Sequence, residues 1–573
     1  MKKIFSCLKN YLKESILGPL FKLFEAILEL LIPLIVAKII NKGIGENLGA
    51  GYILKMVALM ILLGLVGLIC SITAQYFSAK AATGVSKDLR EELFSKIQSL
   101  SYSEIDSEGT SKLINQITTD VNQVQNGVNL FLRLFLRSPF VVVGALIMAF
   151  IVSPKGGLVF LIIIPILLVI IFAILSITRK KYAVVNKDLD VVVRNTRENL
   201  QGVRVIRAFV KEKTEEEEFT NSLNNLVKSQ KNVNLISSIL NPLTYVIINI
   251  GIIFIVYIGA KQVENQELLQ GDVIALYNYM GQILVELIKF ANLILTISKS
   301  LACAARIEKT LNLKSSLRFT VDNDIHSRSF LEFNNVSFKY QNGGANALEN
   351  ISFSCNKGET IGIIGGTGSG KTTLINLIPH FYDVTSGNIF LEGKNINSYD
   401  LTTLRERIGL VPQKAVLFKG TIRSNLAWKD ENATDADMLD ALEIAQGLDI
   451  IRKKQDGLDA VVEENGQNYS GGQKQRLCIA RALIGSPDII IFDDSASALD
   501  YLTDSQLRKA LKTIPNKPLV FIISQRTSSI MNADKIIVLE NGKVVGMGTH
   551  NELLNSSNVY KEIYDSQFKK GEK

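Results

Sequence analysis

The sequence predicts a chain in two parts, a polytopic α-helical membrane domain followed by an α/β domain with a phosphate-binding loop. Three observations predict this division. Apolar residues make up 47% of the chain and are concentrated in its first half. Six apolar stretches there are long enough to cross about 30 Å of hydrocarbon. The second half has a glycine-rich loop ending in Lys-Thr, among alternating short strand and helix patterns.

The predicted spans and their connections define the membrane domain. The spans lie near residues 18–41, 52–75, 129–153, 157–178, 236–260 and 270–297. Two connections, near residues 78–129 and 178–235, are long, rich in both charge signs and free of strand alternation, so the helices are expected to continue beyond the bilayer. The other connections are short and carry few basic residues. The positive-inside bias therefore places both termini, the long connections and the second domain in the cytoplasm, and the spans in the cytoplasmic membrane.

Local patterns predict the ends and turns of these parts. Met1-Lys2-Lys3 resembles the start of a signal peptide, but charged residues interrupt the apolar stretch that would follow. Ile4, Leu8, Tyr11 and Leu12 instead recur at helical spacing, which favours an amphipathic helix at the membrane surface. Residues 106–113 contain a cap residue and Gly109, as a reversal between helices requires. We expect a membrane domain over 1–312, a linker over 313–329 and a second domain over 330–573.

Charge and cysteine content limit the classes of partner. The formal net charge is +8, but the basic residues crowd the segments between apolar spans, and no run of five or six of them occurs. This distribution suits a lipid bilayer, and we expect no nucleic-acid partner. The five cysteines are scattered without a CxxC pair, which is typical of reduced thiols rather than of a metal site or disulfides.

Polar residues inside the predicted spans are costly and point to function. The last span carries a stripe at helical spacing made of Asn278, Gln282, Glu286, Lys289 and Asn292. We expect this stripe to face a wet cavity, with Glu25, Glu29, Arg133 and Arg137 as further candidates. The alternative is that Glu286 and Lys289 pair for packing, and that Glu25 and Arg133 lie near an interface. Together with Tyr277 and Tyr279, the stripe would suit an amphipathic substrate.

The glycine-rich loop predicts a nucleoside triphosphate site that takes ATP and Mg²⁺. An apolar strand pattern precedes it and a helix pattern follows, and it matches G-x-x-x-x-G-K-[ST] with Gly365, Gly366, Thr367, Gly368, Ser369, Gly370, Lys371 and Thr372, before Thr373 in the helix. Backbone N–H groups and the helix N-terminus favour phosphate there. Lys371 would reach the β- and γ-phosphates, and the Thr372 hydroxyl would bind Mg²⁺.

Two further segments belong to the same chemistry. Residues 489–493 form an apolar strand pattern ending in Asp493, which can hold the Mg²⁺ shell as a Walker B acid. A second anion cradle at a predicted helix start consists of Ser470, Gly471, Gly472 and Gln473. Because one phosphate-loop site does not need a second cradle in the same chain, we expect this cradle to serve a nucleotide bound on a different subunit.

With these motifs in place, the chain resembles an ATP-binding cassette (ABC) exporter half-transporter of the type IV exporter fold. The likeness runs essentially end to end, with six spans and long cytoplasmic helical extensions fused to an α/β P-loop ATPase, the ABC nucleotide-binding domain. The phosphate loop, the Ser-Gly-Gly-Gln signature and the Walker B strand in this order are highly specific. The chain is similar to the degenerate-site subunit of bacterial heterodimeric multidrug exporters.

The resemblance implies roles for further residues. Tyr340 matches the aromatic residue that stacks on adenine, and Gln413 matches the glutamine that senses Mg²⁺ and the membrane domain. Residues 497–500 match the D-loop, and residues 463–466 lie where the exporter-specific loop precedes the signature. In the membrane half, residues 198–209 resemble the second cytoplasmic loop. The turn at residues 106–112 resembles the first coupling helix.

Three positions depart from the family pattern. Asp494 stands where hydrolytic members have the glutamate that polarises water, and a carboxylate one methylene shorter is misplaced for in-line attack. Gln525 stands where the switch histidine belongs, and it cannot exchange a proton near neutral pH. Tyr469 replaces the usual leucine before the signature. The first two departures imply a site that binds ATP and hydrolyses it slowly, and hence a partner half-transporter with Glu and His in these positions.

The resemblance therefore implies ATP-driven export of amphipathic small molecules, either drug-like compounds or lipids, by a heterodimer. In such dimers each ATP lies between the phosphate loop of one subunit and the signature of the other, so Ser470 and its neighbours would complete the partner's hydrolytic site. Two alternatives stay open. One is an ATP-gated regulatory membrane protein, and the other is a lipid or peptide exporter that differs only in its cavity.

Overall fold

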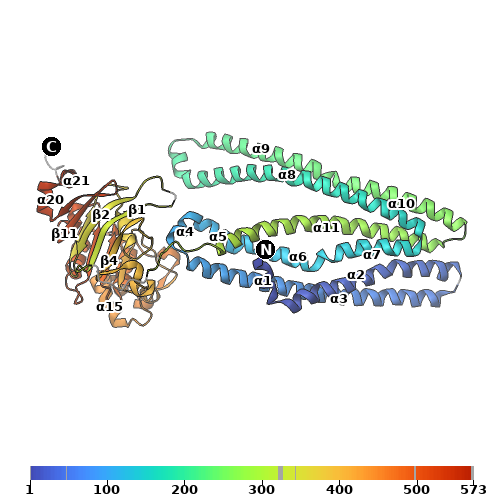
Figure 1. Cartoon of the computed structure of the whole chain (residues 1–573), viewed down its shortest axis with the longest axis horizontal. Helices are drawn as coiled ribbons and strands as arrows, with labels where there is room; N and C mark the ends of the chain where they lie inside the picture. The colour runs from blue at the N-terminus through green and yellow to red at the C-terminus, as the bar shows by residue number, and fades with distance from the viewer. Residues whose placement is uncertain (1, 47, 321–326, 342, 496–498, 569–573) are drawn as a thin grey trace. The chain divides into compact units, whose positions relative to one another are not determined.

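The computed structural model describes residues 2–46, 48–320, 327–341, 343–495 and 499–568, with side chains from residue 6 onward. It divides into two compact units (Figure 1). The first comprises Met1–Gln98 and Ser111–Asn312, and the second comprises Ser99–Thr110 and Leu313–Lys573. A short segment from within the membrane half is thus grouped with the second unit.

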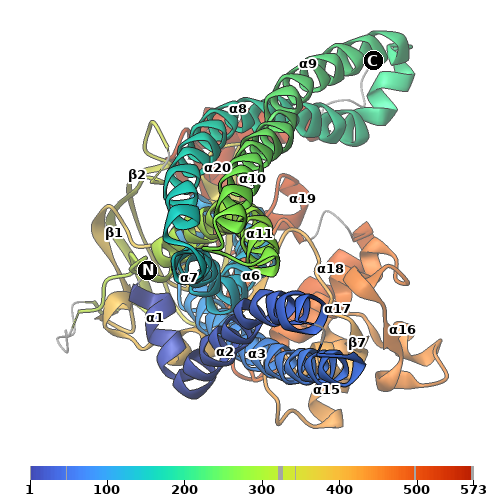
Figure 2. The ribbon, with the colours of Figure 1, turned by 90° about the vertical axis from the view of Figure 1, so that its right-hand side faces the viewer.

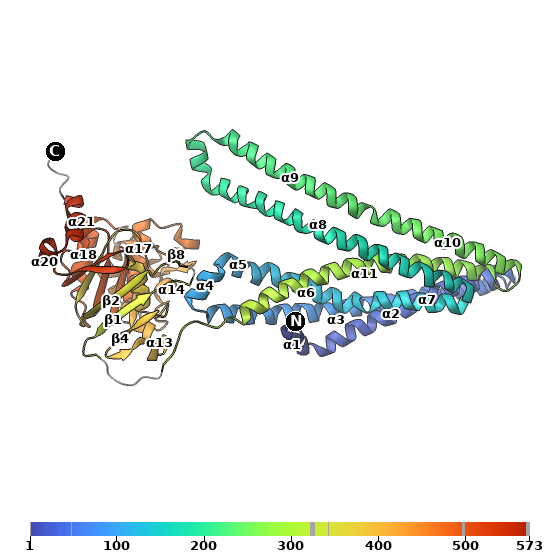
Figure 3. The same ribbon diagram turned by 45° about the horizontal axis from the view of Figure 1, so that its top comes forward.

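The first unit consists of long helices. In chain order they are α1 (Lys2–Lys9), α2 (Leu12–Lys38), α3 (Ala50–Gln98), α5 (Thr110–Asn115), α6 (Val121–Leu130), α7 (Arg137–Val152), α8 (Pro154–Ala208), α9 (Glu212–Ser238), α10 (Leu240–Glu264) and α11 (Gln270–Leu311). Figures 2 and 3 show α2 beside α3 and α8 beside α10, and Figure 3 shows α8 and α9 as an antiparallel pair. The prediction that the helices at the two long connections continue past the spans for several turns is confirmed by α3 and α8.

Among the described residues, five helical segments are long and apolar enough to cross a membrane: Ala50–Gln98, Thr110–Val152, Pro154–Ala208, Glu212–Glu264 and Gln270–Leu311. The remaining predicted span, residues 18–41, falls on α2 and its continuation. Helix α2 is not one of these five segments because it carries the charged residues Lys22, Glu25 and Glu29. Two of these charges pair locally, since Lys22 Nζ lies 2.5 Å from Glu25 Oε2. The third pairs with Arg137, whose Nη2 lies 2.5 Å from Glu29 Oε2.

The predicted reversal near Gly109 is confirmed. Helix α4 (Tyr102–Glu108) ends at Gly109, which has φ 81°, and α5 begins at the next residue. A positive φ is readily adopted by glycine, which has no Cβ to clash with the following carbonyl. Ser101 and Glu104 form a capping box that begins α4. The other long excursion reverses at residues 209–211, where Val210 has φ 55°.

The second unit is an α/β domain built on two main sheets. The larger has the strand order β12-β11-β3-β10-β9-β6. It comprises β12 (Lys543–Gly548), β11 (Lys535–Glu540), β3 (Thr360–Ile364), β10 (Leu519–Ile523), β9 (Ile489–Asp493) and β6 (Ile408–Val411). Only the β11–β12 pair is antiparallel. Strands β3, β9 and β10 are almost entirely buried, which explains their continuous apolar sequence.

A smaller antiparallel sheet of order β2-β1-β4-β5 covers part of this core. It comprises β2 (Leu348–Cys355), β1 (Leu331–Phe338), β4 (Ser386–Leu391) and β5 (Lys394–Asn395). The short strands β7 (Gly420–Thr421) and β8 (Val461–Val462) pair with each other. The helices of the unit, besides α4, are α12 (Lys371–Leu377), α13 (Leu401–Glu406), α14 (Ile422–Leu426), α15 (Asp435–Ile444), α16 (Leu448–Arg452), α17 (Gly471–Leu483), α18 (Tyr501–Leu511), α19 (Thr527–Ile530), α20 (His550–Ser556) and α21 (Asn558–Phe568).

Register within the larger sheet brings three motifs to one edge. Ile523 at the end of β10 is opposite both Ile363 of β3 and Asp493 of β9. Because the carboxyl ends of parallel strands meet at the same edge, the segments that follow β3, β9 and β10 leave the sheet together. These segments are the phosphate loop, the acidic pair Asp493–Asp494 and the switch around Gln525.

Candidate nucleotide site and membrane cavity

The phosphate loop has the backbone that its glycines predict. Gly368 has φ 80° and Gly370 has φ 98°, and Gly370 caps the start of α12. A Cβ added at Gly370 would lie 2.8 Å from the carbonyl oxygen of Ala347, so no larger residue fits there. By contrast, a Cβ at Gly366 or Gly368 would meet nothing within 4 Å. The loop is therefore packed on its inner side and open on the side where a phosphate would lie.

Lys371 lies inside this loop with only 9% of its surface exposed. Its ammonium group donates to the carbonyl oxygens of Gly365 at 2.9 Å and Gly366 at 2.7 Å, and to Ser369 Oγ at 3.3 Å. Burial lowers the pKa of this ammonium, against the opposing attraction of Asp494 and Asp493. The loop thus holds a cation among its own carbonyls, where a polyphosphate would supply the missing negative charge.

The acidic pair stands directly beside the loop. Thr372 Oγ1 donates to Asp493 Oδ1 at 3.1 Å, which brings together two of the side chains predicted to bind Mg²⁺. Burial raises the pKa of Asp493, and the hydrogen bond from Thr372 works in the opposite direction. A buried carboxylate and a hydroxyl are oxygen donors of the kind that Mg²⁺ requires. These residues fit the ion, while Gln413, the third predicted ligand, lies exposed just after β6.

Asp494 has an unusual backbone for a residue other than glycine, with φ 47°. Its N–H donates to the carbonyl of Ile523 at 3.1 Å, which ties it to the end of β10. Burial raises the pKa of its carboxyl group, while Lys371 and Arg526 lower it. Strained backbone of this kind is concentrated at functional sites, where the surrounding structure holds it in place.

The switch segment follows β10 and begins with Ser524, whose N–H donates to the carbonyl of Ile363 at 3.2 Å. The side chain of Gln525 is exposed. The backbone carbonyl oxygen of Gln525 accepts a 2.7 Å hydrogen bond from Nε2 of Gln567 in α21. No local sequence pattern links Gln567, a residue of α21, to the switch, so its contact could not be predicted from the sequence.

Tyr340 lies after β1 in a small aromatic cluster. Its hydroxyl is 3.0 Å from Thr373 Oγ1, in the first turn of the helix that follows the phosphate loop. Its ring centroid lies 4.8 Å from that of Phe338 and 5.5 Å from that of Tyr382, both edge-on. The structure therefore brings Tyr340 to the phosphate-loop helix, with its ring half-buried.

The signature segment begins α17, as predicted. Ser470 is exposed and caps this helix through a reciprocal pair of hydrogen bonds with Gln473, at 3.0 and 3.4 Å. The preceding Tyr469 is 5% exposed and donates its hydroxyl to the carbonyl of Val461 at 3.1 Å. The tyrosine therefore fills the core position of the usual leucine and gains a polar partner. Of the D-loop, Ser497 and Ala498 lie outside the described residues, and Asp500 caps α18.

Comparison with known proteins supports the same assignment. The family described as "ABC transporter transmembrane region" matches residues 15–287, and the family "ABC transporter" matches residues 348–497. An uncharacterized ABC transporter ATP-binding protein, YfiB of Bacillus subtilis (strain 168), is 37% identical over 573 residues, covering 99% of both chains. This chain belongs to the ABC transporter family.

Two further comparisons bear on the fold and the relatives of this ABC transporter. The ATP-dependent lipid A-core flippase of Photorhabdus laumondii is 30% identical over 520 residues, covering 90% of this chain and 88% of the flippase. The solved structure of a bacterial Atm1-family ABC exporter with ATP bound superposes with a TM-score of 0.81 at 21% identity, covering 99% of both chains. The predicted exporter fold is confirmed. The chain is a membrane-embedded ABC half-transporter whose ATP hydrolysis is coupled to transport.

Within the second unit, this transporter has an aromatic contact between α4 and the nucleotide-binding domain. The ring centroids of Tyr102 and Phe381 are 4.5 Å apart. Tyr382 donates its hydroxyl to Asp106 Oδ2 at 2.6 Å. The segment that resembles the first coupling helix thus contacts Tyr382, and the ring of Tyr382 in turn lies against the ring of Tyr340.

The first unit of the transporter contains a cavity of about 610 Å³ between α2, α10 and α11. Four members of the predicted stripe line it: Asn278, Gln282, Glu286 and Lys289. Glu29, Tyr277 and other residues complete the lining. Asn292 does not line it, and Tyr279 is fully buried with its hydroxyl bound to the carbonyl of Leu30 at 2.7 Å. The expectation of a polar cavity is met by these four, whereas the suggested role of Tyr279 is wrong because helix packing occupies it.

Glu286 is also paired, so both readings of the stripe hold for it. Its Oε1 accepts from Arg137 Nη1 at 2.6 Å and from Lys289 Nζ at 3.0 Å, and its Oε2 accepts from Ser138 Oγ at 2.8 Å. Arg137 also bonds Glu29, which remains 39% exposed at the cavity. Both carboxylate oxygens of Glu286 are therefore already hydrogen-bonded, while part of the Glu29 side chain stays accessible to a ligand.

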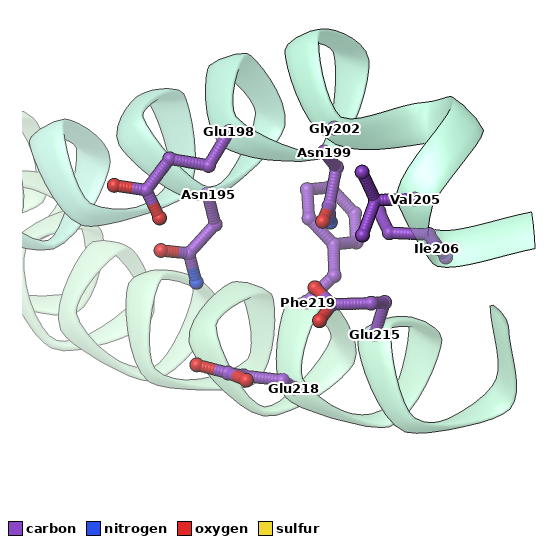
Figure 4. Close-up of a pocket in the computed structure, with 9 residues that line it drawn as sticks. All are labelled: Asn195, Glu198, Asn199, Gly202, Val205, Ile206, Glu215, Glu218 and Phe219. Atoms are coloured by element: carbon purple, nitrogen blue, oxygen red, sulfur yellow. The ribbon is translucent and has the colours of Figure 1, made fainter. Parts of the chain in front are cut away.

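The hairpin of α8 and α9 encloses a smaller pocket of about 240 Å³ near its tip (Figure 4). Asn195 and Asn199 from α8 and Phe219 from α9 lie between the two helices. Asn195 Nδ2 donates to Ser222 Oγ at 3.0 Å, which joins the helices. On α9, Glu216, Glu217 and Glu218 are exposed and Glu215 is partly exposed.

Proposed function

We propose that this ABC half-transporter exports amphipathic small molecules, drug-like compounds or lipids, as one half of a heterodimer whose ATP sites are unequal. It lies in the cytoplasmic membrane, with both termini and the nucleotide-binding domain in the cytoplasm. Its parts are a membrane domain over residues 1–312, a linker over 313–329 and an ABC nucleotide-binding domain over 330–573. The site on its own phosphate loop binds ATP and hydrolyses it slowly.

The observation that carries this proposal is the pair Asp494 and Gln525 beside an otherwise complete phosphate loop. A water-polarising carboxylate must be placed within a few tenths of an ångström, and a displacement of about 1 Å can cost roughly a hundredfold in rate. Asp494 has a side chain one methylene shorter than glutamate. Gln525 hydrogen-bonds without exchanging a proton, so this site has a shortened carboxylate in place of the usual base and no titratable switch.

The other residues of the site keep the capacity to bind. Lys371 and the loop N–H groups from Gly365 to Thr372 would hold the phosphates, Thr373 lies in the first turn of the following helix, and Tyr340 would stack on adenine. Thr372, Gln413 and Asp493 would hold Mg²⁺, which when bound neutralises charge on the β- and γ-phosphates. This division of labour, binding without efficient hydrolysis, favours a site that stays occupied and holds two subunits together.

The signature segment supports the second half of the proposal. Ser470 is exposed at the start of a 13-residue helix, and its hydrogen bonds with Gln473 are local. Gly471 is exposed and Gly472 is half-buried. A helix N-terminus with accessible glycines favours an anion. We infer that residues 470–473 complete the hydrolytic site of a partner half-transporter that has Glu after its Walker B aspartate and His in its switch.

The substrate class rests on the cavity of the first unit. The lining of this cavity is mixed: polar side chains such as Asn278, Gln282 and Tyr277 lie there with apolar ones such as Ile32, Val36 and Ile252. A volume of about 610 Å³ suits a small organic molecule or part of a lipid. Relatives named as lipid A-core flippases favour a lipid as an alternative to a drug-like compound.

One experiment tests the central proposal. The chain is purified alone and then with a co-expressed half-transporter that has Glu after its Walker B aspartate and His in its switch, and ATPase activity and dye or lipid movement are measured in vesicles. We expect slow hydrolysis by the chain alone, and substrate-stimulated hydrolysis with transport by the pair. Rapid hydrolysis by the chain alone would overturn the unequal-site proposal. ATP-dependent gating without movement of any tested solute would favour a regulatory role.

A further inference from the structure

The switch segment is held from its outer side by one side chain of the last helix. Gln567 in α21 makes three hydrogen bonds to it, donating from Nε2 to the carbonyl of Gln525 at 2.7 Å. Its Oε1 accepts from Thr527 N at 2.9 Å and from Thr527 Oγ1 at 2.7 Å. An amide oxygen has two lone pairs, so this acceptor is fully used.

These bonds give a hydrogen-bond partner to a backbone N–H of the switch segment that has none inside its own helix. Thr527 begins α19, and the first N–H groups of a helix have no partner inside it. The residue before it, Arg526, makes no side-chain cap bond. Thr527 itself is fully buried, so without this acceptor its N–H would have no hydrogen-bond partner from solvent and would be destabilising. Gln567 therefore serves as the N-cap of α19, from a helix 40 residues further along the chain.

The helix that presents Gln567 is fixed by its own packing. Tyr560 in α21 is fully buried, and its hydroxyl lies 2.7 Å from Nδ1 of His550. Tyr564 and Phe568 stack at 4.6 Å between ring centroids. The position of α21 thus does not depend on Gln567, which is itself exposed. Its three bonds instead position the segment that they reach.

The inner side of the same segment is bonded to the nucleotide site. Ser524 N donates to the carbonyl of Ile363, the residue two positions before the phosphate loop, at 3.2 Å. Asp494 N donates to the carbonyl of Ile523 at 3.1 Å. The switch segment around Gln525 is therefore hydrogen-bonded to the nucleotide site on one side and to the side-chain amide of Gln567 on the other.

We propose that Gln567 is a positioning residue for the nucleotide site, which holds the switch so that Gln525 meets the γ-phosphate of ATP. The proposal deepens the function given above and rests on it for the role of Gln525. Loss of the three bonds leaves the phosphate loop intact and frees the switch. ATP is then captured as before and released sooner.

The test uses the full-length transporter in lipid nanodiscs. This chain is charged with radiolabelled azido-ATP and Mg²⁺, chased with unlabelled ATP, and cross-linked by light at intervals, so that label on this polypeptide reports release from its own site. We expect Gln567→Ala to speed release about fivefold to tenfold, and to lower the melting temperature of the ligand-free protein because the buried N–H of Thr527 loses its acceptor. Asn555→Ala, which removes an amide that bonds only the carbonyl of Asn551 at 3.0 Å, is the matched control and leaves release unchanged.

A second variant separates positioning from folding. Gln567→Glu keeps the acceptor for Thr527 but loses the donor to the Gln525 carbonyl, so we expect faster release with α19 still capped. Release within twofold of the wild-type rate in both variants would overturn the proposal. Faster release that occurs only in a variant with a lowered melting temperature would overturn it as well, because loss of stability would then account for the faster release. If the wild-type chain alone hydrolyses ATP rapidly, the unequal-site function fails, and Gln567 is then tested by a fall in kcat at constant KM.

Discussion

Tyr382 donates a 2.6 Å hydrogen bond to the carboxylate of Asp106, and this bond joins α4 to the nucleotide-binding domain. Burial, reinforced by the hydrogen bond to Asp106, raises the pKa of the Tyr382 hydroxyl, so it remains a donor at neutral pH. The Tyr382 ring lies 5.5 Å from that of Tyr340. Movement of α4 and the position of the candidate adenine-stacking ring are therefore linked by one side chain.

Tyr382→Phe removes this bond while keeping the ring contacts. A hydrogen bond to a charged group contributes about 1.5–3 kcal/mol, so the coupling between α4 and the domain should weaken markedly. We expect substrate movement to fall about fivefold or more, with ATP affinity within twofold of wild type. Vesicle transport and equilibrium nucleotide binding measure the two.

Tyr399→Phe is the matched control for this prediction. It deletes a tyrosine hydroxyl that donates to the carbonyl of Leu391 at 2.8 Å in the same unit, away from α4. Equal losses of transport in the two variants would mean that a general loosening of the domain, rather than the Asp106 bond, is responsible.

The double substitution Asp494→Glu with Gln525→His restores the two groups that hydrolytic members use. If these residues limit the site, hydrolysis by the chain alone should rise by about tenfold to a hundredfold. Phosphate release measured on the purified chain tests this, with Lys371→Ala in the same background as the inactive reference. An unchanged rate would show that another feature, such as the left-handed backbone at residue 494, limits hydrolysis.

Much of the fold and of the nucleotide site could be predicted from the sequence because the determinants are local. The glycine spacing sets the backbone of the phosphate loop, and the apolar run before Asp493 needs only a buried strand. The helix start at Ser470 is likewise visible as a cap followed by glycines. In each case neighbouring residues along the chain determine the structure, so the pattern is sufficient.

What could not be predicted depends on contacts between distant segments. Nothing local to Gln567 indicates that it caps a helix 40 residues earlier. The burial of Tyr279 follows from the approach of Leu30 in another helix, and the saturation of Glu286 follows from Arg137 and Ser138 in α7.

Lys371→Ala should weaken ATP binding to this chain. The ammonium group is the only cation among the residues of the phosphate loop, and a charge-assisted bond to phosphate is worth about 1.5–3 kcal/mol. We expect Kd for ATP to rise about tenfold to a hundredfold. Lys394→Ala, an exposed lysine of β5, is the control and should leave Kd unchanged. Equal affinity in the two variants would contradict the role given to Lys371.

The ion network around Glu286 gives the last prediction. The side chains of Glu286 and Arg137 are only 4% and 7% exposed, so removing Glu286 leaves the buried Arg137 with only the partly exposed Glu29 as its counter-charge. Glu286→Gln should destabilise the membrane domain by about 3–5 kcal/mol, whereas Lys289→Gln removes a half-exposed cation and should cost about 1 kcal/mol or less. Thermal unfolding of the detergent-solubilised protein measures both. Replacing the pair together, with Glu286→Met and Arg137→Met, should recover most of the loss because the charges that remain, Glu29 and Lys289, are partly exposed to solvent. Failure to recover would assign the network to a specific packing role instead.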